Sequence, residues 1–229
     1  MTYNKIITGK FVARPNRFIA QVEIEGRLER VHVKNTGRCR ELLVPGARLI
    51  LEDCSQNKNR KTRYSIIAVY KGDRLINMDS QVPNQVVHEA ISEGRIARLG
   101  QVENLRREFS FLSSRFDIYF EKNGQASLLE VKGVTLEEEG RALFPDAPTA
   151  RGRKHLLELV EALDLGYKSY VLFLIQMEEV HSFSPNQAMD PDFYQALLAG
   201  QEAGLEILAY NCRVTEDSID LLEEIPVEL

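Results

Sequence analysis

The chain has 229 residues, enough to bury a substantial core in one or two domains. With 44% hydrophobic and 28% charged residues, its composition is that of an ordinary globular protein, and no apolar run approaches the roughly 20 residues that span a bilayer. The first residues lack the apolar core of a signal peptide, and Cys39, Cys54 and Cys212 show no C-x-x-C spacing. We therefore expect a cytoplasmic protein without a membrane segment, a disulfide framework or a zinc site.

The net charge of −5 conceals a division between two parts of the chain. Residues 1–80 carry 16 Lys and Arg against 8 Asp and Glu, whereas residues 81–229 carry 13 against 26, so the balances are +8 and −13. Such an asymmetry indicates two domains, and a basic domain is typical of proteins that bind a polyanion. A merely basic surface is the alternative interpretation.

Residues 1–80 have the pattern of a small β-barrel. Short apolar or alternating runs, typical of strands, are separated by turn residues and lie at 6–12, 18–25, 28–33, 47–51, 64–70 and 75–78. Residues 53–63, DCSQNKNRKTR, are too polar and irregular for a strand or a helix. The number of strands and the basic charge predict an OB-like, nucleic-acid-binding domain over residues 1–80.

Residues 81–229 alternate between helical and strand patterns, which predicts a second domain with a mixed α/β sheet. Helices are expected from Asn84, as N-cap, to Gly94, near 98–107, from about 153 to 164, and from the Asp190-Pro191 cap to about 202. Strands are expected near 107–112, 115–121, 127–131, 170–175 and 205–210. The segments EEEG and FPDAP are expected to form a loop, and the acidic stretch from Glu216 a solvated surface.

The segment SRFDIYFEKNGQASLLEVKGVTL contains the most informative pattern. Asn123-Gly124 favours a tight hairpin turn because both residues tolerate positive φ. Glu130 and Lys132 then point to the same face of their strand, and in-register pairing brings Asp117 alongside them. Two carboxylates bind a hard cation such as Mg²⁺ or Mn²⁺, and a nearby Lys orients a water or stabilises developing charge, as phosphodiester cleavage requires. A cluster of ion pairs without catalytic role is the alternative.

The order of these elements, a helix, three strands, a helix and a strand, is that of the PD-(D/E)xK nuclease core. The two acidic residues lie on the second and third strands. In that fold the first helix often adds a carboxylate, and Glu89 is the candidate here, with an exposed helix glutamate as the alternative. The predicted catalytic set is therefore Asp117, Glu130, Lys132 and Glu89, with Asp117 and Glu130 as metal ligands.

Three basic clusters are candidates for binding phosphate groups. Side-chain cations and backbone N–H groups suit phosphate oxygens, and basic residues at a positive helix N-terminus are costly unless an anion lies among them. Each cluster alone reads as a solvated loop, but together with the carboxylates they favour binding to a nucleic-acid backbone. The clusters are Arg14 and Arg17; Lys34, Arg38 and Arg40; and Arg151, Arg153 and Lys154, followed by His155.

The segments RPNRF, NTGRCREL with VPGARL, SRFD, LEVKGVTL and FPDAPTARGRKHL closely resemble the sugar fermentation stimulation protein A (SfsA) family, and the similarity runs over nearly the whole chain. The resemblance implies an N-terminal OB-like domain, a PD-(D/E)xK-like domain, DNA binding without sequence specificity, and a link to the regulation of sugar, particularly maltose, use. It also implies the motif residues Asp117, Glu130 and Lys132, with Glu89 as the further residue from the first helix. Two positions depart from the family pattern: Cys39 replaces a usual Met, and Gly133 a usual Ser.

These observations predict a DNA-binding protein whose second domain presents phosphate to a bound Mg²⁺ or Mn²⁺, without an organic cofactor. Binding should be salt-sensitive and independent of base sequence, because the implicated residues suit phosphates rather than base edges. A non-enzymatic DNA-binding regulator on a nuclease fold is the first alternative. An RNA-directed role is the second, since OB barrels also accept single-stranded RNA.

Overall fold

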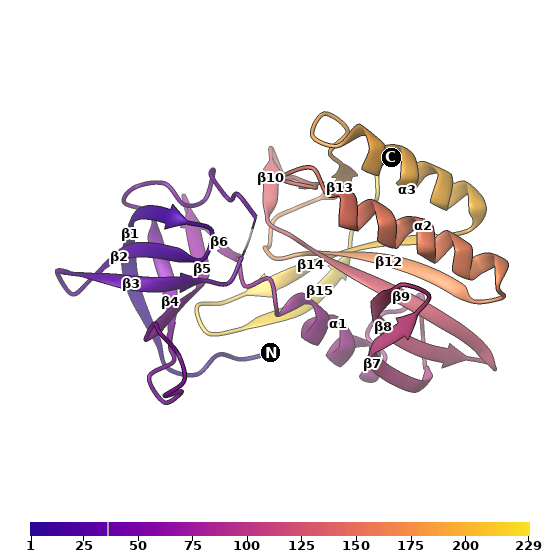
Figure 1. The fold of residues 1–229 in the computed structure, drawn as a ribbon, viewed down its shortest axis with the longest axis horizontal. Coiled ribbons are helices and arrows are strands. Elements are labelled where there is room, and N and C mark those ends of the chain that lie inside the picture. Colours follow the sequence, from indigo (N-terminus) through magenta and orange to yellow (C-terminus); the bar gives the residue numbers. More distant parts are fainter. Residues whose placement is uncertain (36) are drawn as a thin grey trace.

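The computed structural model describes residues 1–35 and 37–229, so Thr36 of the basic segment 34–40 lies outside the described residues. Two β-structures lie side by side, an N-terminal barrel and a C-terminal sheet covered by helices (Figure 1). No helix among the described residues combines the length and the apolar character needed to cross a membrane.

The N-terminal part is a closed OB barrel, as predicted. Its strands neighbour one another in the order β3-β2-β1-β4-β5-β6, and β3 also pairs with β5, which closes the barrel. Alternate residues of these strands point inward, so Val22, Val31, Leu49 and Ile66 are fully buried. The strands are β1 (Ile6–Asn16), β2 (Ile19–Ile24), β3 (Arg27–Val33), β4 (Arg48–Asp53), β5 (Tyr64–Lys71) and β6 (Arg74–Asn77).

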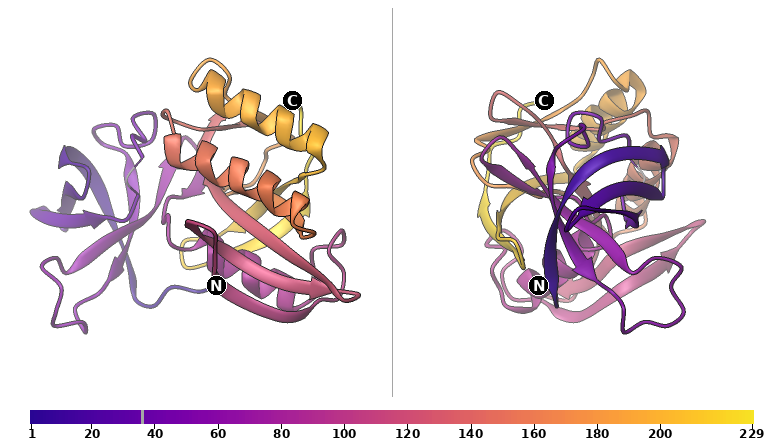
Figure 2. Two further views of the ribbon diagram at one scale, coloured as in Figure 1. Left: turned by 45° about the vertical axis from the view of Figure 1, so that its right-hand side comes forward. Right: turned by 90° about the vertical axis from the view of Figure 1, so that its left-hand side faces the viewer.

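The C-terminal part is an α/β domain built on a six-stranded mixed sheet of order β15-β14-β12-β9-β8-β7. One face is covered by α1 and the other by α2, against which α3 packs (Figure 2). The elements are α1 (Pro83–Ser92), β7 (Glu103–Phe111), β8 (Ser114–Lys122), β9 (Gln125–Val134), α2 (Ala150–Asp164), β12 (Lys168–Ile175), α3 (Pro191–Ala203), β14 (Glu206–Val214) and β15 (Ile219–Glu224).

The predicted central strand and last helix are confirmed. In β12, Val171 and Phe173 face the α2 side whereas Leu172 and Leu174 face the α1 side, and this explains its uninterrupted apolar sequence. Helix α3 begins at the predicted Asp190 cap, whose side chain accepts a hydrogen bond from the Phe193 N–H, and it ends before Gly204.

Several predicted elements of the second domain are wrong. Residues 98–107 do not form a helix, because residues 103–111 form the polar edge strand β7, which is mostly exposed on both faces. The expected loop after β9 contains the hairpin of β10 (Leu136–Glu138) and β11 (Arg141–Phe144), which pairs with β13 (Ser182–Pro185). The acidic stretch from Glu216 includes β15, paired with β14. Strand β7 has no clear hydrophobic alternation, and that of β15 is limited to Ile219 and Leu221, which is too short a signal for a sequence-based prediction.

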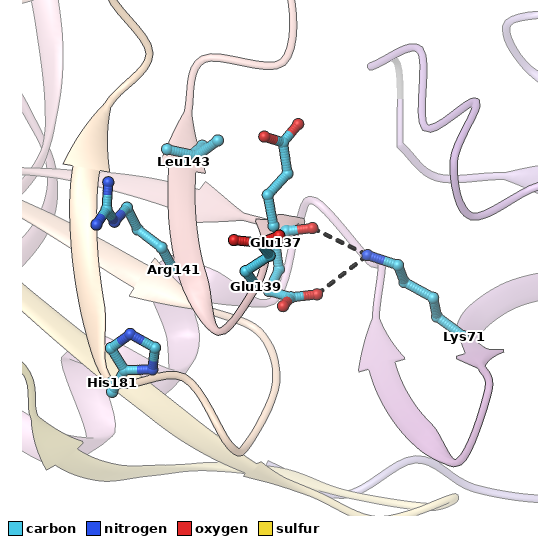
Figure 3. A pocket seen from close by; sticks show the side chains of 7 residues that line it. Lys71, Glu137, Glu139, Arg141, Leu143 and His181 are labelled. Atoms are coloured by element: carbon cyan, nitrogen blue, oxygen red, sulfur yellow. Dashed lines mark hydrogen bonds and ion pairs between the residues drawn. The ribbon is translucent and has the colours of Figure 1, made fainter.

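The two domains share polar contacts along their boundary. Lys71 of the barrel donates hydrogen bonds to the carbonyl and carboxylate oxygens of Glu137 at 2.9 and 3.0 Å, as Figure 3 shows. These two residues, with Arg141 and His181, line a pocket of about 610 Å³. None of the predicted site residues lines this pocket, so it does not mark the carboxylate site.

Candidate functional site

The β8–β9 hairpin forms at the predicted turn and brings Asp117 to the strand that carries Glu130. Asn123 and Gly124 have φ values of 52° and 76°, and the paired ladder runs from Lys122 with Gln125 back to Ile118 with Leu129. There the two strands separate. The Asp117 carboxylate then accepts the Val131 N–H at 2.8 Å through Oδ2, taking the place of a backbone acceptor.

Glu130 and Lys132 lie on the same face of β9, two residues apart. The Lys132 Nζ donates to Glu130 Oε1 at 2.6 Å, and the two side chains are 12% and 4% exposed. A buried pair of this kind persists only when further hydrogen bonds satisfy the carboxylate. The hairpin therefore gathers Asp117, Glu130 and Lys132 as expected.

His155 of α2 supplies that further hydrogen bond, whereas its sequence context had indicated a phosphate-binding cluster instead. Its imidazole is buried, its Nδ1 donates to Glu130 Oε1, and its ring lies edge-on to Phe116 at 5.9 Å between ring centroids. The helical spacing to Leu159 and Ala162, four and seven residues later, places His155 on the buried face of α2. That spacing was the signal available in the sequence.

The contribution of α1 to the site is Asn84 rather than Glu89. Asn84 was predicted to be the N-cap, but the cap is Val82, and the Asn84 amide donates to Asp117 Oδ1 at 2.5 Å. The Glu89 carboxylate lies instead 3.2 Å from the N-terminal ammonium of Met1. The structure therefore does not bring Glu89 to the other three predicted catalytic residues.

The two carboxyl groups differ in their electrostatic environment. Burial, and then the negative charge of Glu130, raise the pKa of the Asp117 carboxyl to about 6. Burial acts in the same direction on Glu130, but the hydrogen bonds and positive charges of His155 and Lys132 outweigh it and lower the pKa of Glu130 below its ordinary value. Glu130 is therefore ionised at neutral pH, whereas the Asp117 carboxyl group, with a pKa of about 6, titrates close to neutral pH.

One carboxylate oxygen of this cluster is suited to a cation. Glu130 Oε2 is buried and has no hydrogen-bond partner among the described residues. Within residues 1–35 and 37–229, no group of three or more His, Cys, Asp or Glu side chains is arranged around a common point. A hard cation held by Asp117 and Glu130 would thus need further oxygen ligands from water, backbone carbonyls or phosphate, which is the usual situation for Mg²⁺.

Two of the predicted phosphate-binding residues have internal partners instead. The guanidinium of Arg14 donates to four backbone carbonyls, those of Arg17, Asn35, Gly37 and Arg38, at 2.7 to 2.9 Å. The Lys34 side chain is 11% exposed, and its Nζ lies 2.6 Å from Asp79 and 3.2 Å from Glu52. Arg14 therefore links the described residues Asn35, Gly37 and Arg38, and Lys34 is neutralised by carboxylates.

The other predicted phosphate-binding residues of the barrel, Arg17, Arg38 and Arg40, are exposed. Arg17 stacks over the exposed Phe18 ring at 4.7 Å, and Arg38 and Arg40 point to solvent. The Arg38 backbone N–H donates to Asp146 Oδ2 at 3.1 Å, which ties the basic segment of the barrel to the loop that precedes α2.

The third basic cluster lies in the first turns of α2. The helix begins three residues before the predicted position because Thr149 caps it, accepting the Gly152 N–H at 3.0 Å. Arg153 pairs with Asp192, and Lys154 lies 3.6 Å from Glu158, whereas Arg151 is exposed.

Comparison with known proteins agrees with this fold over the whole chain. The family model described as the SfsA N-terminal OB domain matches residues 12–78, and that described as the sugar fermentation stimulation protein RE domain matches residues 81–218. A sugar fermentation stimulation protein homolog from Alkaliphilus oremlandii is 53% identical over 100% of this chain and 99% of its own. A homolog of the same name from Desulfitobacterium hafniense is 51% identical, with the same coverage.

A solved structure shows the same architecture. The structure of Pyrococcus furiosus SfsA in complex with Ca²⁺ matches with a TM-score of 0.91 and 27% sequence identity, covering 100% of this chain and 98% of that one. The matches to both domain families and the full-length relatives at about half identity are more than a shared fold would produce. This chain therefore belongs to the sugar fermentation stimulation protein (SfsA) family, with an N-terminal OB domain followed by an α/β domain.

Proposed function

We propose that this protein binds DNA through its phosphate backbone and hydrolyses phosphodiester bonds at a Mg²⁺ or Mn²⁺ ion held by Asp117 and Glu130. The observation that carries the proposal is the buried Glu130 Oε2, which has no hydrogen-bond partner among the described residues. The carboxylate to which it belongs is close to the Asp117 carboxyl group and to the Lys132 ammonium group. Burying carboxylates in this way is costly unless a positive charge compensates for them. A bound cation provides that compensation for the oxygen that Lys132 and His155 leave free.

The roles of the residues follow from their positions. Asp117 and Glu130 would hold the cation, which when bound polarises the phosphate and lowers the pKa of a bound water. Lys132, on a long side chain next to Glu130, can donate to the attacking water or to a phosphate oxygen. The Pyrococcus furiosus SfsA structure is a complex with Ca²⁺, and this supports the proposal because Ca²⁺, like Mg²⁺, takes oxygen ligands.

DNA binding would use the exposed cations close to the domain boundary. The bond from the Arg38 N–H to Asp146 holds the segment carrying Arg38 and Arg40 against the loop that leads to Arg151. Arginine binds phosphate oxygens in a bidentate manner, and such contacts carry no base information. Binding should therefore be independent of sequence and weaken steeply with salt.

A second candidate function is DNA binding without cleavage. It is favoured by the hydrogen bonds in the site, because both Asp117 oxygens and Glu130 Oε1 already accept a hydrogen bond. A nuclease fold does not by itself establish catalysis. On either proposal, control of sugar use would follow from binding to DNA, and the names of the relatives are the support for that link.

The deciding experiment is cleavage of labelled single-stranded DNA, double-stranded DNA and RNA in Mg²⁺, Mn²⁺ or EDTA. Wild type is compared with Glu130→Gln and Lys132→Ala, and the matched controls are Glu121→Gln and Lys122→Ala near the other end of the same hairpin. Metal-dependent cleavage that is lost only in the first pair supports the nuclease. DNA binding without cleavage in wild type supports the second candidate, and a preference for RNA contradicts both.

The binding surface is tested by gel shift over a range of salt concentrations. Arg40→Ala and Arg151→Ala should each weaken binding and reduce the salt slope by about one. Arg27→Ala, which removes an exposed cation at the start of β3, is the control and should leave the slope unchanged. Equal effects of all three variants would contradict the proposed surface.

A further inference from the structure

We propose that His155 is a positioning residue of this site, which holds the Glu130 carboxylate so that Oε2 stays available to the cation. The inference rests on the proposed cation site and goes beyond it by adding a residue outside the predicted catalytic set. It begins from the asymmetry of the Glu130 carboxylate, whose Oε1 receives both Lys132 Nζ and His155 Nδ1 while Oε2 has no partner among the described residues.

Two donors on one oxygen determine the rotation of the carboxylate. Lys132 reaches Oε1 from β9, and His155 reaches it from α2, which packs on β8, β9 and β12. Turning the carboxylate about its last bond would break both hydrogen bonds and leave two largely buried donors unsatisfied. Oε2 is therefore kept in one orientation, which is the usual effect of a second residue bonded to a metal ligand.

The two donors differ in how firmly they are held. The His155 side chain is 7% exposed and its ring lies against Phe116, whereas Lys132 has a flexible four-carbon stem. If Lys132 turns toward water or phosphate during the reaction, His155 is the described residue that still donates to Oε1. His155 of α2 would thus orient the Glu130 carboxylate, and Lys132 would be free to donate to the water or the phosphate.

Helix α1, which packs on the other face of the sheet, makes a comparable contact. Asn84, from α1, donates to Asp117 Oδ1, as His155, from α2, donates to Glu130 Oε1. Each helix thus holds one of the two carboxylates on the hairpin. The sheet between the helices contributes buried core residues on both faces, and this keeps the two carboxylates in place relative to each other.

The test is calorimetric titration of Mn²⁺ into the full chain. His155→Leu keeps bulk but removes the donor, and its Mn²⁺ affinity should fall about 10- to 100-fold. His155→Asn should bind nearly as wild type does, because the Asn amide nitrogen occupies the position of the imidazole Nδ1. His181→Leu, on a histidine of the separate pocket in Figure 3, is the control and should not change affinity.

The outcomes separate this inference from the proposed function. Wild-type affinity in a folded His155→Leu protein overturns the role of His155 and leaves the cation site standing. Absence of Mn²⁺ binding in wild type overturns the cation site and the role of His155 with it. If His155→Leu does not fold, His155→Gln replaces it, since its amide lies one carbon farther along the side chain. Equal affinities of the Asn and Gln variants then overturn the inference.

Discussion

Replacing Asp117 by Asn removes the carboxyl group whose titration the structure perturbs most clearly within the site. Burial, and then the charge of Glu130, raise the pKa of Asp117 from 3.8 to about 6. A carboxyl group whose pKa is higher in the folded state stabilises the fold fully below its unfolded pKa, and this contribution is lost as pH rises through the folded pKa. The difference between the two values corresponds to roughly 3 kcal/mol.

The expected result is a pH-dependent difference between the variant and wild type. In EDTA, the free energy of unfolding of Asp117→Asn relative to wild type should rise by about 2 kcal/mol between about pH 4 and about pH 8. The amide cannot accept hydrogen bonds from both Asn84 and the Val131 N–H, but that cost is the same at every pH. The lost hydrogen bond therefore does not affect how the difference in the free energy of unfolding changes with pH.

Urea unfolding followed by far-ultraviolet circular dichroism is the suitable assay, because the chain contains no Trp. Saturating Mg²⁺ should reduce the difference at high pH, since the cation compensates the carboxylate only in wild type. A variant-minus-wild-type difference that stays flat within about 0.5 kcal/mol over this pH range would refute the reasoning. It would mean that Asp117 is better solvated than its burial indicates.

Three further substitutions test the placement of individual residues. Glu89→Gln should leave Mn²⁺ affinity and cleavage unchanged and alter stability by less than about 1 kcal/mol, because its partner is the N-terminal ammonium; loss of cleavage would contradict its placement. Gly133→Ser should cost about 1–3 kcal/mol in thermal unfolding, since a Cβ there would lie 2.5 Å from Gln176 Oε1, and an unchanged melting temperature would contradict this contact. Lys34→Met should cost about 3–5 kcal/mol in urea unfolding by leaving the buried Asp79 unpaired, with partial recovery on adding Asp79→Asn; if the second change brings no recovery, the pair is not the cause.

The hairpin at the site could be predicted because all its signals are local. Asn123-Gly124 sets the turn, the alternation of β9 sets which residues share a face, and the register then brings Asp117 to Val131. The helix capped by Asp190 was predictable for the same reason. In each case, the residues that decide the conformation lie within a few positions of it.

Exposed strands were not predictable from pattern. The edge strand β7 is mostly exposed, and the alternation of buried and exposed residues in the outer strand β15 is limited to Ile219 and Leu221, so the hydrophobic pattern of each strand is weak or short. They are strands because β8 and β14 offer unpaired backbone groups beside them. These unpaired backbone groups become available for pairing only once the sheet has formed.

The sequence by itself determined the OB and α/β domains, the family, and the hairpin that gathers Asp117, Glu130 and Lys132. Only the tertiary structure decided which side chains surround that hairpin, because Asn84 and His155 reach it from helices that pack on opposite faces of the sheet. It also decided which cations are free. Lys34 and Arg40 are both basic residues of one short segment of the sequence. Folding places the buried Asp79 carboxylate beside Lys34, whereas Arg40 stays exposed to solvent. The contact between Lys34 and Asp79 joins residues far apart in the chain, and no local pattern encodes it.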